Sequence, residues 1–286
     1  PHIPTADYAI VGGSATLGCR LPEDVDVSGV TVLDRDLRFD TPFGESQPFK
    51  LFRFEAAHTA DGHDHLALAI RIHGWRTGEN WATSPGQRQV FWVLEQAGVR
   101  KVVGNAGVGA VNPLLDPGDL VLADDFLDHT RHDLPALHDT WPNSVNMLDP
   151  YCPALKVGMA QAAEPLFRRV FTRGIMATVD GPWLEGVAQV RALRLSGADM
   201  VANSTVPEVH YAREIGACYA AAYLIVDHAN GVAAGFDRNI MVRTYAAGAK
   251  PVAEIMLRAL QTAGSQPCNC MTYRNPLPLN WDEPSP

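Results

Sequence analysis

The chain has 286 residues, of which 47% are hydrophobic and 19% are charged; this composition supports one large α/β domain or two small ones. Its formal net charge of −9 argues against nucleic-acid binding, because affinity for a phosphate backbone comes mostly from clustered lysines and arginines. No apolar run is long enough for a membrane span, the first residues do not read as a signal sequence, and the five cysteines follow no disulfide framework, so we expect a cytoplasmic protein.

Apolar stretches alternate with helical patterns along the chain. Predicted strands lie at residues 8–11, 30–33, 49–54, 66–72, 101–103, 120–123, 200–202 and 218–226. Residues 90–97 and 252–260 repeat apolar side chains with helical spacing, and the first of these helices should stop at Gly98. This alternation predicts a three-layer α/β/α sandwich with a central mixed sheet.

The chain shows no internal repeat and no linker that would separate two domains. We expect a single domain over residues 1–286, with a core at about 8–264 and a surface tail at 265–286. Residues 129–153 hold several prolines and no periodicity, which predicts a long loop over a site or a subunit contact.

Two segments near the N-terminus are typical of anion sites. Consecutive glycines after the first strand, followed by Ser14, would expose backbone and hydroxyl donors, but their spacing matches neither the dinucleotide nor the P-loop motif. Arg71 and His73 lie on one face at the end of a strand, with Trp75 next, and suit an anion beside a sugar. A plain strand turn and a solvated edge strand are the alternatives.

Three further segments place polar side chains after apolar ones. Asn105 lies among glycines after residues 101–103, where a tight crossover turn is equally plausible. Glu185 is expected to open a helix, where a helix dipole alone would explain a carboxylate. Residues 205–208 form a capping-box sequence that predicts a helix start, but capping does not account for Asn203 and Ser204.

Asp227 lies at the polar end of a strand that is predicted to be buried. Its carboxyl is either ionised and paired, or has a raised pKa and carries a proton. A protonated acid could donate to a ring nitrogen of a bound heterocycle and make the ring a leaving group. The alternative is a strand-end residue that caps the following turn.

Taken in order, these segments resemble the trimeric purine nucleoside phosphorylase and methylthioadenosine phosphorylase family from about residue 8 to about residue 260. The most specific pieces are Gly-Pro-Trp-Leu-Glu-Gly-Val-Ala at 181–188, Gly-Ala-Asp at 197–199 and Ser-Thr-Val-Pro-Glu-Val at 204–209. Asp-Pro-Tyr-Cys-Pro at 149–153 is similar to the methylthioadenosine branch. The resemblance implies phosphorolysis of a purine nucleoside with a modified 5′ position by a homotrimer or a dimer of trimers, with phosphate as co-substrate and no cofactor.

The resemblance also implies roles for residues. Asp227 and His73 would be catalytic; the phosphate site would be Ser14, Arg71, His73, Asn105, Ala106 and Ser204; Trp75 and Asn203 would contact ribose; and Leu184, Glu185 and Asp227 would bind the base. Residues 238–242 and 144–147 would surround the 5′ end of the sugar.

Several positions depart from the family pattern. Asn203 replaces a methionine, Leu184 replaces a stacking phenylalanine for which Trp183 could compensate, and Ala229 replaces a second aspartate of the adenine-specific pattern. Glu185 matches enzymes that act on 6-oxopurines, whereas Asp227 matches the methylthioadenosine enzymes, so the base stays open, with adenine slightly ahead.

Three other functions remain open from the sequence. They are a nucleoside hydrolase on the same scaffold, a catalytically idle nucleoside-binding protein, and an oxidoreductase that binds a nicotinamide cofactor at the Gly12 turn. We expect no metal site, because no Cys/His cluster has ligand spacing. Whether Cys268 and Cys270 pair is also open.

Overall fold

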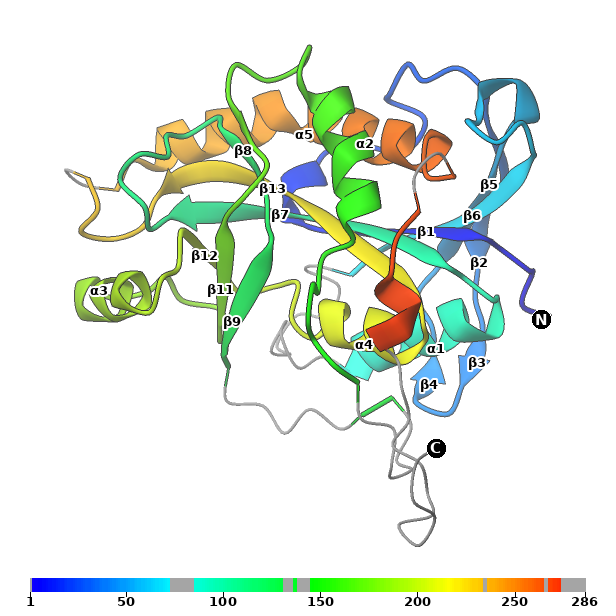
Figure 1. The fold of residues 1–286 in the computed structure, drawn as a ribbon, viewed down its shortest axis with the longest axis horizontal. Helices are drawn as coiled ribbons and strands as arrows, with labels where there is room; N and C mark the ends of the chain where they lie inside the picture. The colour runs from blue at the N-terminus through cyan, green and yellow to red at the C-terminus, as the bar shows by residue number, and fades with distance from the viewer. Residues whose placement is uncertain are drawn as a thin grey trace, which may run out of the picture.

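The computed structural model describes residues 2–72, 85–130, 136–137, 145–233, 236–264 and 267–273. A mixed sheet crosses the molecule, with helices on both faces (Figure 1). Helices α2 (Pro153–Ala163) and α5 (Arg238–Gln261) cover one face, and α1 (Pro85–Gln96) and α4 (Glu208–Glu214) cover the other. The predicted three-layer α/β/α sandwich with a mixed sheet is therefore confirmed.

Parallel strands form the middle of the sheet. Strands β13 (Cys218–His228), β7 (Lys101–Ala110), β1 (Tyr8–Gly12) and β6 (His65–Arg71) lie side by side in that order. The antiparallel strands β5 (Phe49–Phe54) and β2 (Val30–Leu37) extend one side, and β8 (Leu120–Leu122) with β10 (Val170–Phe171) extends the other. The central strands are nearly continuous apolar runs because helices cover both of their faces.

A second group of strands branches from the end of β7. Strand β12 (Met200–Ala202) pairs antiparallel with β7, β11 (Ile175–Val179) pairs with β12, and β9 (Asp125–His129) pairs with β11. Helix α3 (Val187–Leu195) packs beside this branch. The remaining elements are the hairpin of β3 (Asp40–Thr41) and β4 (Gly44–Glu45) and the 3-10 turns η1 (Ser14–Thr16), η2 (Ala56–His58) and η3 (Cys270–Tyr273).

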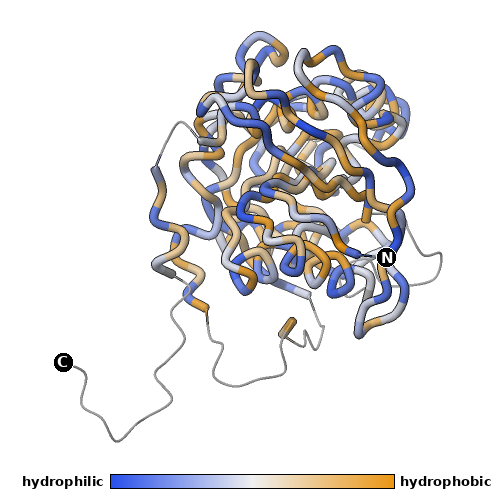
Figure 2. Tube along the Cα trace, turned by 90° about the vertical axis from the view of Figure 1, so that its right-hand side faces the viewer, coloured by the Kyte–Doolittle hydropathy of each residue, from blue (hydrophilic) through white to orange (hydrophobic). Residues whose placement is uncertain are grey.

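The core lies on both faces of the sheet. Figure 2 shows hydrophobic segments crossing the middle of the molecule, with hydrophilic segments mostly on the outer turns. One apolar cluster joins the sheet to α1 and α4, and a second joins it to α2 and α5. Among the described residues, no helix is both long enough and apolar enough to cross a membrane.

The glycine-rich segment after residue 103 continues strand β7, so the crossover turn that the sequence left open is not formed there. A Cβ added at Gly104 would lie 2.6 Å from the Tyr219 hydroxyl oxygen, and one added at Gly107 would lie 2.3 Å from Cε1 of Tyr245. These glycines therefore make room for aromatic side chains from β13 and α5 that pack directly on the strand.

A helix begins at the predicted segment 205–208, but its capping box does not form. Helix α4 begins at Glu208, and no side chain caps it. Thr205 has a φ of 77°, and its hydroxyl accepts a hydrogen bond from Tyr223 at 3.1 Å. The buried Glu208 carboxylate accepts one from the Tyr219 hydroxyl at 2.8 Å. Tertiary hydrogen bonds to two tyrosines of β13 thus replace the local cap.

Candidate active site

A cavity opens where β7, β12 and β13 end, beside the first turns of α5. It brings together six of the predicted site residues, which come from four separate parts of the chain: Ser14, Leu184, Glu185, Asn203, Ser204 and Asp227. Since the carboxyl ends of parallel strands β7 and β13 meet at this edge, it is the expected place for a ligand in an open α/β sheet.

Asp227 reaches the cavity through an irregularity in β13. The register between β13 and β7 shifts between Ile225 and Asp227, so that Asp227 pairs with Gly109. A Cβ at Gly109 would lie only 3.3 Å from the Asp227 carboxylate oxygen Oδ1. The local bulge and the missing side chain on β7 together give the carboxyl its place.

The two carboxyls of the cavity influence each other. Burial, followed by the nearby charge of Glu185, raises the pKa of Asp227 to about 6. Burial also raises the pKa of Glu185, whereas hydrogen bonds from its own backbone N–H and from the Asn203 side chain oppose that rise. Because both pKa values are raised, this pair of carboxyls retains one proton near neutral pH more readily than two isolated carboxyls do.

Backbone contacts fix the segment that carries Glu185. The Asn230 side-chain amide donates to the Glu185 carbonyl at 2.9 Å, and that of Asn203 donates to the Val179 carbonyl at 3.2 Å. Helix α3 begins only at Val187, so Glu185 precedes the helix instead of opening it. With 6% exposure its side chain is buried against the cavity, which a simple dipole role would not require.

Ser14 lies on another wall of the cavity, beside α5. Its hydroxyl oxygen accepts a hydrogen bond from the Gly107 backbone N–H at 2.9 Å, and the side chain also hydrogen-bonds Tyr245. Burial raises the pKa of Tyr245, which keeps its hydroxyl neutral. No sequence pattern pointed to Tyr245, because the exposed first half of α5 shows no periodicity, whereas Met241, which also lines the cavity, lies within the predicted segment 238–242.

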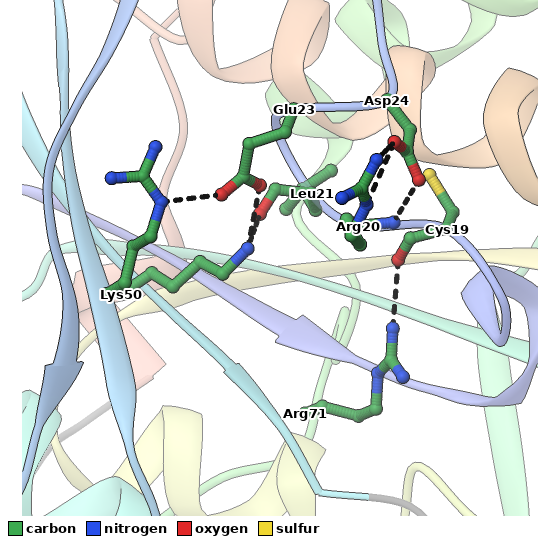
Figure 3. A network of polar contacts seen from close by, with 8 residues as sticks. Cys19, Arg20, Leu21, Glu23, Asp24, Lys50 and Arg71 are labelled. Atoms are coloured by element: carbon green, nitrogen blue, oxygen red, sulfur yellow. Dashed lines mark hydrogen bonds and ion pairs between the residues drawn. The ribbon is translucent and has the colours of Figure 1, made fainter.

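Arg71 lies in a different cavity from Asp227. Its guanidinium Nη2 donates to the Cys19 carbonyl at 2.9 Å (Figure 3), and it shares this second cavity with Thr16, Arg20 and Lys50. Figure 3 also shows Arg20 paired with Asp24 and Lys50 paired with Glu23. The turn η1 separates the two cavities, since Ser14 at its start lines one and Thr16 at its end lines the other.

Asn105 lies between these two regions. Its side-chain amide donates to the Thr16 hydroxyl at 3.3 Å, and its Oδ1 has no hydrogen-bond partner among the described residues although the side chain is 99% buried. Ala106 is buried in β7. His73 and Trp75 lie outside the described residues. The predicted phosphate residues are thus divided between two neighbouring regions.

The residues that depart from the family pattern do not all line the cavity. Leu184 lines the cavity, whereas Trp183 is 62% exposed and does not line it, so Trp183 does not take the place of a stacking aromatic here. Arg238 begins α5 on the exposed side, outside the cavity lining. Of residues 238–242, Met241 alone lines the cavity, which makes that wall apolar.

A cysteine cluster contradicts the expectation from spacing. Cys152, Cys218, Cys268 and Cys270 have their sulfur atoms within 4.8 Å of one another. Two of the separations along the chain exceed 45 residues, so no local motif could reveal the group.

This α/β/α sandwich, with a cavity at the carboxyl ends of its parallel strands, is the fold of solved nucleoside phosphorylase structures. The family model described as "Phosphorylase superfamily" matches residues 69–261, and the chain belongs to that superfamily. The resemblance inferred from the motifs is confirmed, and the oxidoreductase alternative loses its support.

Two named relatives illustrate the range of similarity. The protein named "Probable S-methyl-5′-thioinosine phosphorylase" from Methanopyrus kandleri is 34% identical over 171 residues, which cover 59% of this chain and 66% of that protein, just under two thirds. The S-methyl-5′-thioadenosine phosphorylase of Pyrococcus horikoshii is 27% identical and covers 91% of this chain and 95% of that protein.

Solved structures share the fold. A methylthioadenosine phosphorylase from an antarctic soil metagenomic library aligns with a TM-score of 0.79 at 22% identity, covering 94% of this chain and 91% of that one. The Schistosoma mansoni methylthioadenosine phosphorylase in complex with adenine aligns with a TM-score of 0.72 at 21% identity, covering 92% and 93%.

Proposed function

We propose that the protein cleaves the N-glycosidic bond of a purine nucleoside with a modified 5′ position, using inorganic phosphate as the nucleophile. The products are the free base and a 5-modified ribose-1-phosphate, so the enzyme is a pentosyltransferase. The observation that carries the proposal is the pair of Asp227, half-buried, and Glu185, buried, in a cavity that Ser14 and Ser204 also line.

Asp227 provides the proton for the leaving group. When the glycosidic bond breaks, its electrons move into the purine, and a protonated carboxyl near N7 can donate to that nitrogen. A carboxyl with a pKa of about 6 keeps a usable protonated fraction near neutral pH, whereas an ordinary aspartate would be almost fully ionised.

Glu185 selects the base. A 6-oxopurine has an N1–H that needs an acceptor and an N7 that needs a donor, so it fits an ionised Glu185 opposite a protonated Asp227. Burial raises the pKa of Glu185, and the hydrogen bonds that its carboxyl receives oppose that rise, which is the direction that this assignment requires. We therefore place a 6-oxopurine ahead of adenine, the reverse of the order suggested by sequence; the name of the Methanopyrus relative agrees with this choice.

Phosphate binds beneath the sugar in this proposal. Ser14 and Ser204 line the cavity, Arg71 lies across η1 from Ser14, and Asn105 lies between the two regions. A phosphate held there supplies both the nucleophile and the negative charge that stabilises an oxocarbenium-like sugar. The roles of His73 and Trp75 rest on the family resemblance alone, and phosphate is the only co-substrate that we propose.

The wall formed by α5 suits a 5′ substituent that is apolar. Met241 and Tyr245 contribute a thioether and an aromatic ring there. A flexible thioether packs well against a methylthio group. We also propose a homotrimer or a dimer of trimers, because the family completes this end of the site with a loop from a neighbouring subunit; light scattering coupled to gel filtration tests this directly.

Product analysis tests the reaction. The purified chain is incubated with S-methyl-5′-thioinosine, S-methyl-5′-thioadenosine or inosine, with and without phosphate, and free base and sugar phosphate are quantified. We expect phosphate-dependent release of base with an equal amount of ribose-1-phosphate derivative. Base release that does not need phosphate would identify a hydrolase, and thermal stabilisation by nucleosides without any product would identify a binding protein.

A further inference from the structure

The cysteine cluster joins three parts of the fold that are distant in sequence. Cys152 directly precedes α2, Cys218 begins β13, and Cys268 and Cys270 belong to the C-terminal segment around η3. All four sulfurs lie within 4.8 Å of one another, and those of Cys218 and Cys268 are 3.4 Å apart. Every one of them is a free thiol.

This spacing fits a tetrahedral metal site. Four sulfurs bound to one Zn²⁺ at about 2.3 Å lie about 3.8 Å from each other. This distance falls between the 3.4 Å that separates the Cys218 and Cys268 sulfurs and the 4.8 Å within which all four sulfurs lie. Four thiolates are also the donor set that selects zinc over the hard cations, which prefer oxygen ligands.

The surroundings can stabilise the charge of such a site, which is −2 for zinc with four thiolates. Arg213 is 3% exposed and donates to the Cys270 carbonyl at 3.1 Å and to the Asp149 carbonyl at 2.7 Å. It thus places a buried positive charge against the two backbone segments that bring Cys152 and Cys270 together.

The first turn of α2 acts in the same direction. The Leu155 backbone N–H, in the first turn of this helix, donates a hydrogen bond to the Cys152 sulfur. This donor can stabilise the negative charge of a metal-bound thiolate.

The cluster is also closed and yet accessible to an ion. Cys152, Cys218 and Cys270 are buried, and Cys268 is half-buried. A surface cavity lined by Asp149, Pro153, Pro267, Asn269 and the two C-terminal cysteines leads to it. With four protein ligands no coordination position is left for a substrate, so the site would be structural and not catalytic.

We propose that Cys152, Cys218, Cys268 and Cys270 bind one Zn²⁺ that fastens the C-terminal segment to α2 and β13. Each thiol gives up its proton on binding, so four protons are released per zinc. No electron is transferred, and the thiols stay reduced.

The proposed site connects to the cavity of Asp227 through the core. Tyr151 precedes Cys152, and its hydroxyl lies 2.8 Å from that of Tyr223. Tyr223 in turn donates to Thr205, the neighbour of Ser204. Zinc would therefore hold the segment that supports one wall of the candidate active site, although the metal itself lies outside it.

Metal analysis of the full chain tests the proposal independently of catalysis. The protein is produced with zinc in the medium, purified without chelators or metal resins, and its zinc is measured by mass spectrometry. We expect about one zinc per chain in the wild type and in the Cys19→Ala control, since Cys19 lies outside the cluster, and less than about a tenth of that in Cys268→Ser/Cys270→Ser.

Two measurements on the wild type keep the test decisive if the variant does not fold. Titration with an organomercurial should release the zinc as the cluster thiols react, and cobalt in place of zinc should give the intense visible bands of tetrahedral thiolate coordination. A wild type that takes up no zinc when it is supplied would overturn the proposal. Reactive thiols are also counted in the unfolded, unreduced and metal-free chain. One reactive thiol instead of five would overturn the proposal as well, because two disulfides would then hold the four cysteines of the cluster.

Discussion

Replacing Asp227 gives the sharpest test of the proposed chemistry. Asp227→Ala removes the donor to the leaving base, and loss of one such donor typically raises the barrier by about 2.7–4 kcal/mol, so turnover should fall by roughly 10²–10³-fold. Asp227→Asn keeps an N–H donor and should lose less. Because the protonated form is active and the pKa is about 6, wild-type turnover should decline as the pH rises above that value, and the Asn variant should not show this decline.

The same substitution changes stability in a defined pH window. The folded-state pKa of Asp227 is raised from 3.8 to about 6, so between these values the native state binds the proton more tightly than the unfolded chain does. The free energy of unfolding therefore falls as the pH rises through this window, and the loss is complete above about pH 6. The shift corresponds to about 3 kcal/mol, or roughly 2 kcal/mol once solvent contact of the half-buried carboxyl is allowed for.

Initial rates and chemical unfolding, each measured across that window, check both expectations. Asp227→Asn should be more stable than the wild type by roughly 2 kcal/mol at about pH 7.5 and lose this advantage at about pH 4. Glu164→Gln, an exposed carboxyl at the end of α2, serves as the control and should change neither quantity. Near-normal turnover of Asp227→Ala, or an unchanged pH dependence in Asp227→Asn, would refute the reasoning.

Three further substitutions are predicted from the same geometry. Glu185→Gln removes a nearby negative charge, so the decline in turnover should move to lower pH, and kcat/KM for 6-oxopurine nucleosides should fall about tenfold more than for adenine nucleosides. Arg71→Ala should raise the KM for phosphate by about 10–100-fold in steady-state assays, because a charged hydrogen bond is worth about 1.5–3 kcal/mol. Gly107→Ala should lower the free energy of unfolding by about 1–3 kcal/mol in urea titrations, because its Cβ would lie 2.3 Å from Tyr245.

The predictions for Arg71→Ala and Gly107→Ala each have a matched control variant. Arg20→Ala removes a guanidinium from the cavity of Arg71, but one that is already paired with Asp24, so the KM for phosphate should stay within about twofold. Gly186→Ala meets nothing within 4 Å and should change stability by less than about 0.5 kcal/mol. Equal effects of the two arginine variants would exclude Arg71 from phosphate binding, and equal effects of the two glycine variants would contradict the packing argument.

The strands that were predicted correctly are those whose apolar residues show in the sequence that the strand is buried. Strands β1 and β13 are nearly continuous apolar or aromatic runs, since both faces of this part of the sheet are covered, and β5 has phenylalanines at 49, 52 and 54 that are buried. Strands β9 and β11 were missed, and β9 has no apolar run that would reveal it, because only Phe126 and Leu127 separate its polar ends. The predicted strand at 101–103 was too short, and a turn was left open beyond it, because the glycines in the second half of β7 serve packing and not chain reversal.

The sequence by itself determined which side chains can take part in the chemistry and in what order they occur. Asp227 was identified from its place at the end of a buried run, and Ser14, Glu185 and Ser204 from their motifs; the structure brings all four to one cavity. These assignments succeed because strand order and strand direction place such residues at a common edge of the sheet.

Only the tertiary structure decided what those side chains experience. The raised pKa of Asp227 depends on burial and on Glu185, which is 42 residues earlier in the chain (227 − 185). The position of Arg71 across η1 and the meeting of four cysteines likewise depend on how distant segments pack. Desolvation, charge coupling and ligand geometry arise from proximity in space, which residue spacing along the chain does not encode.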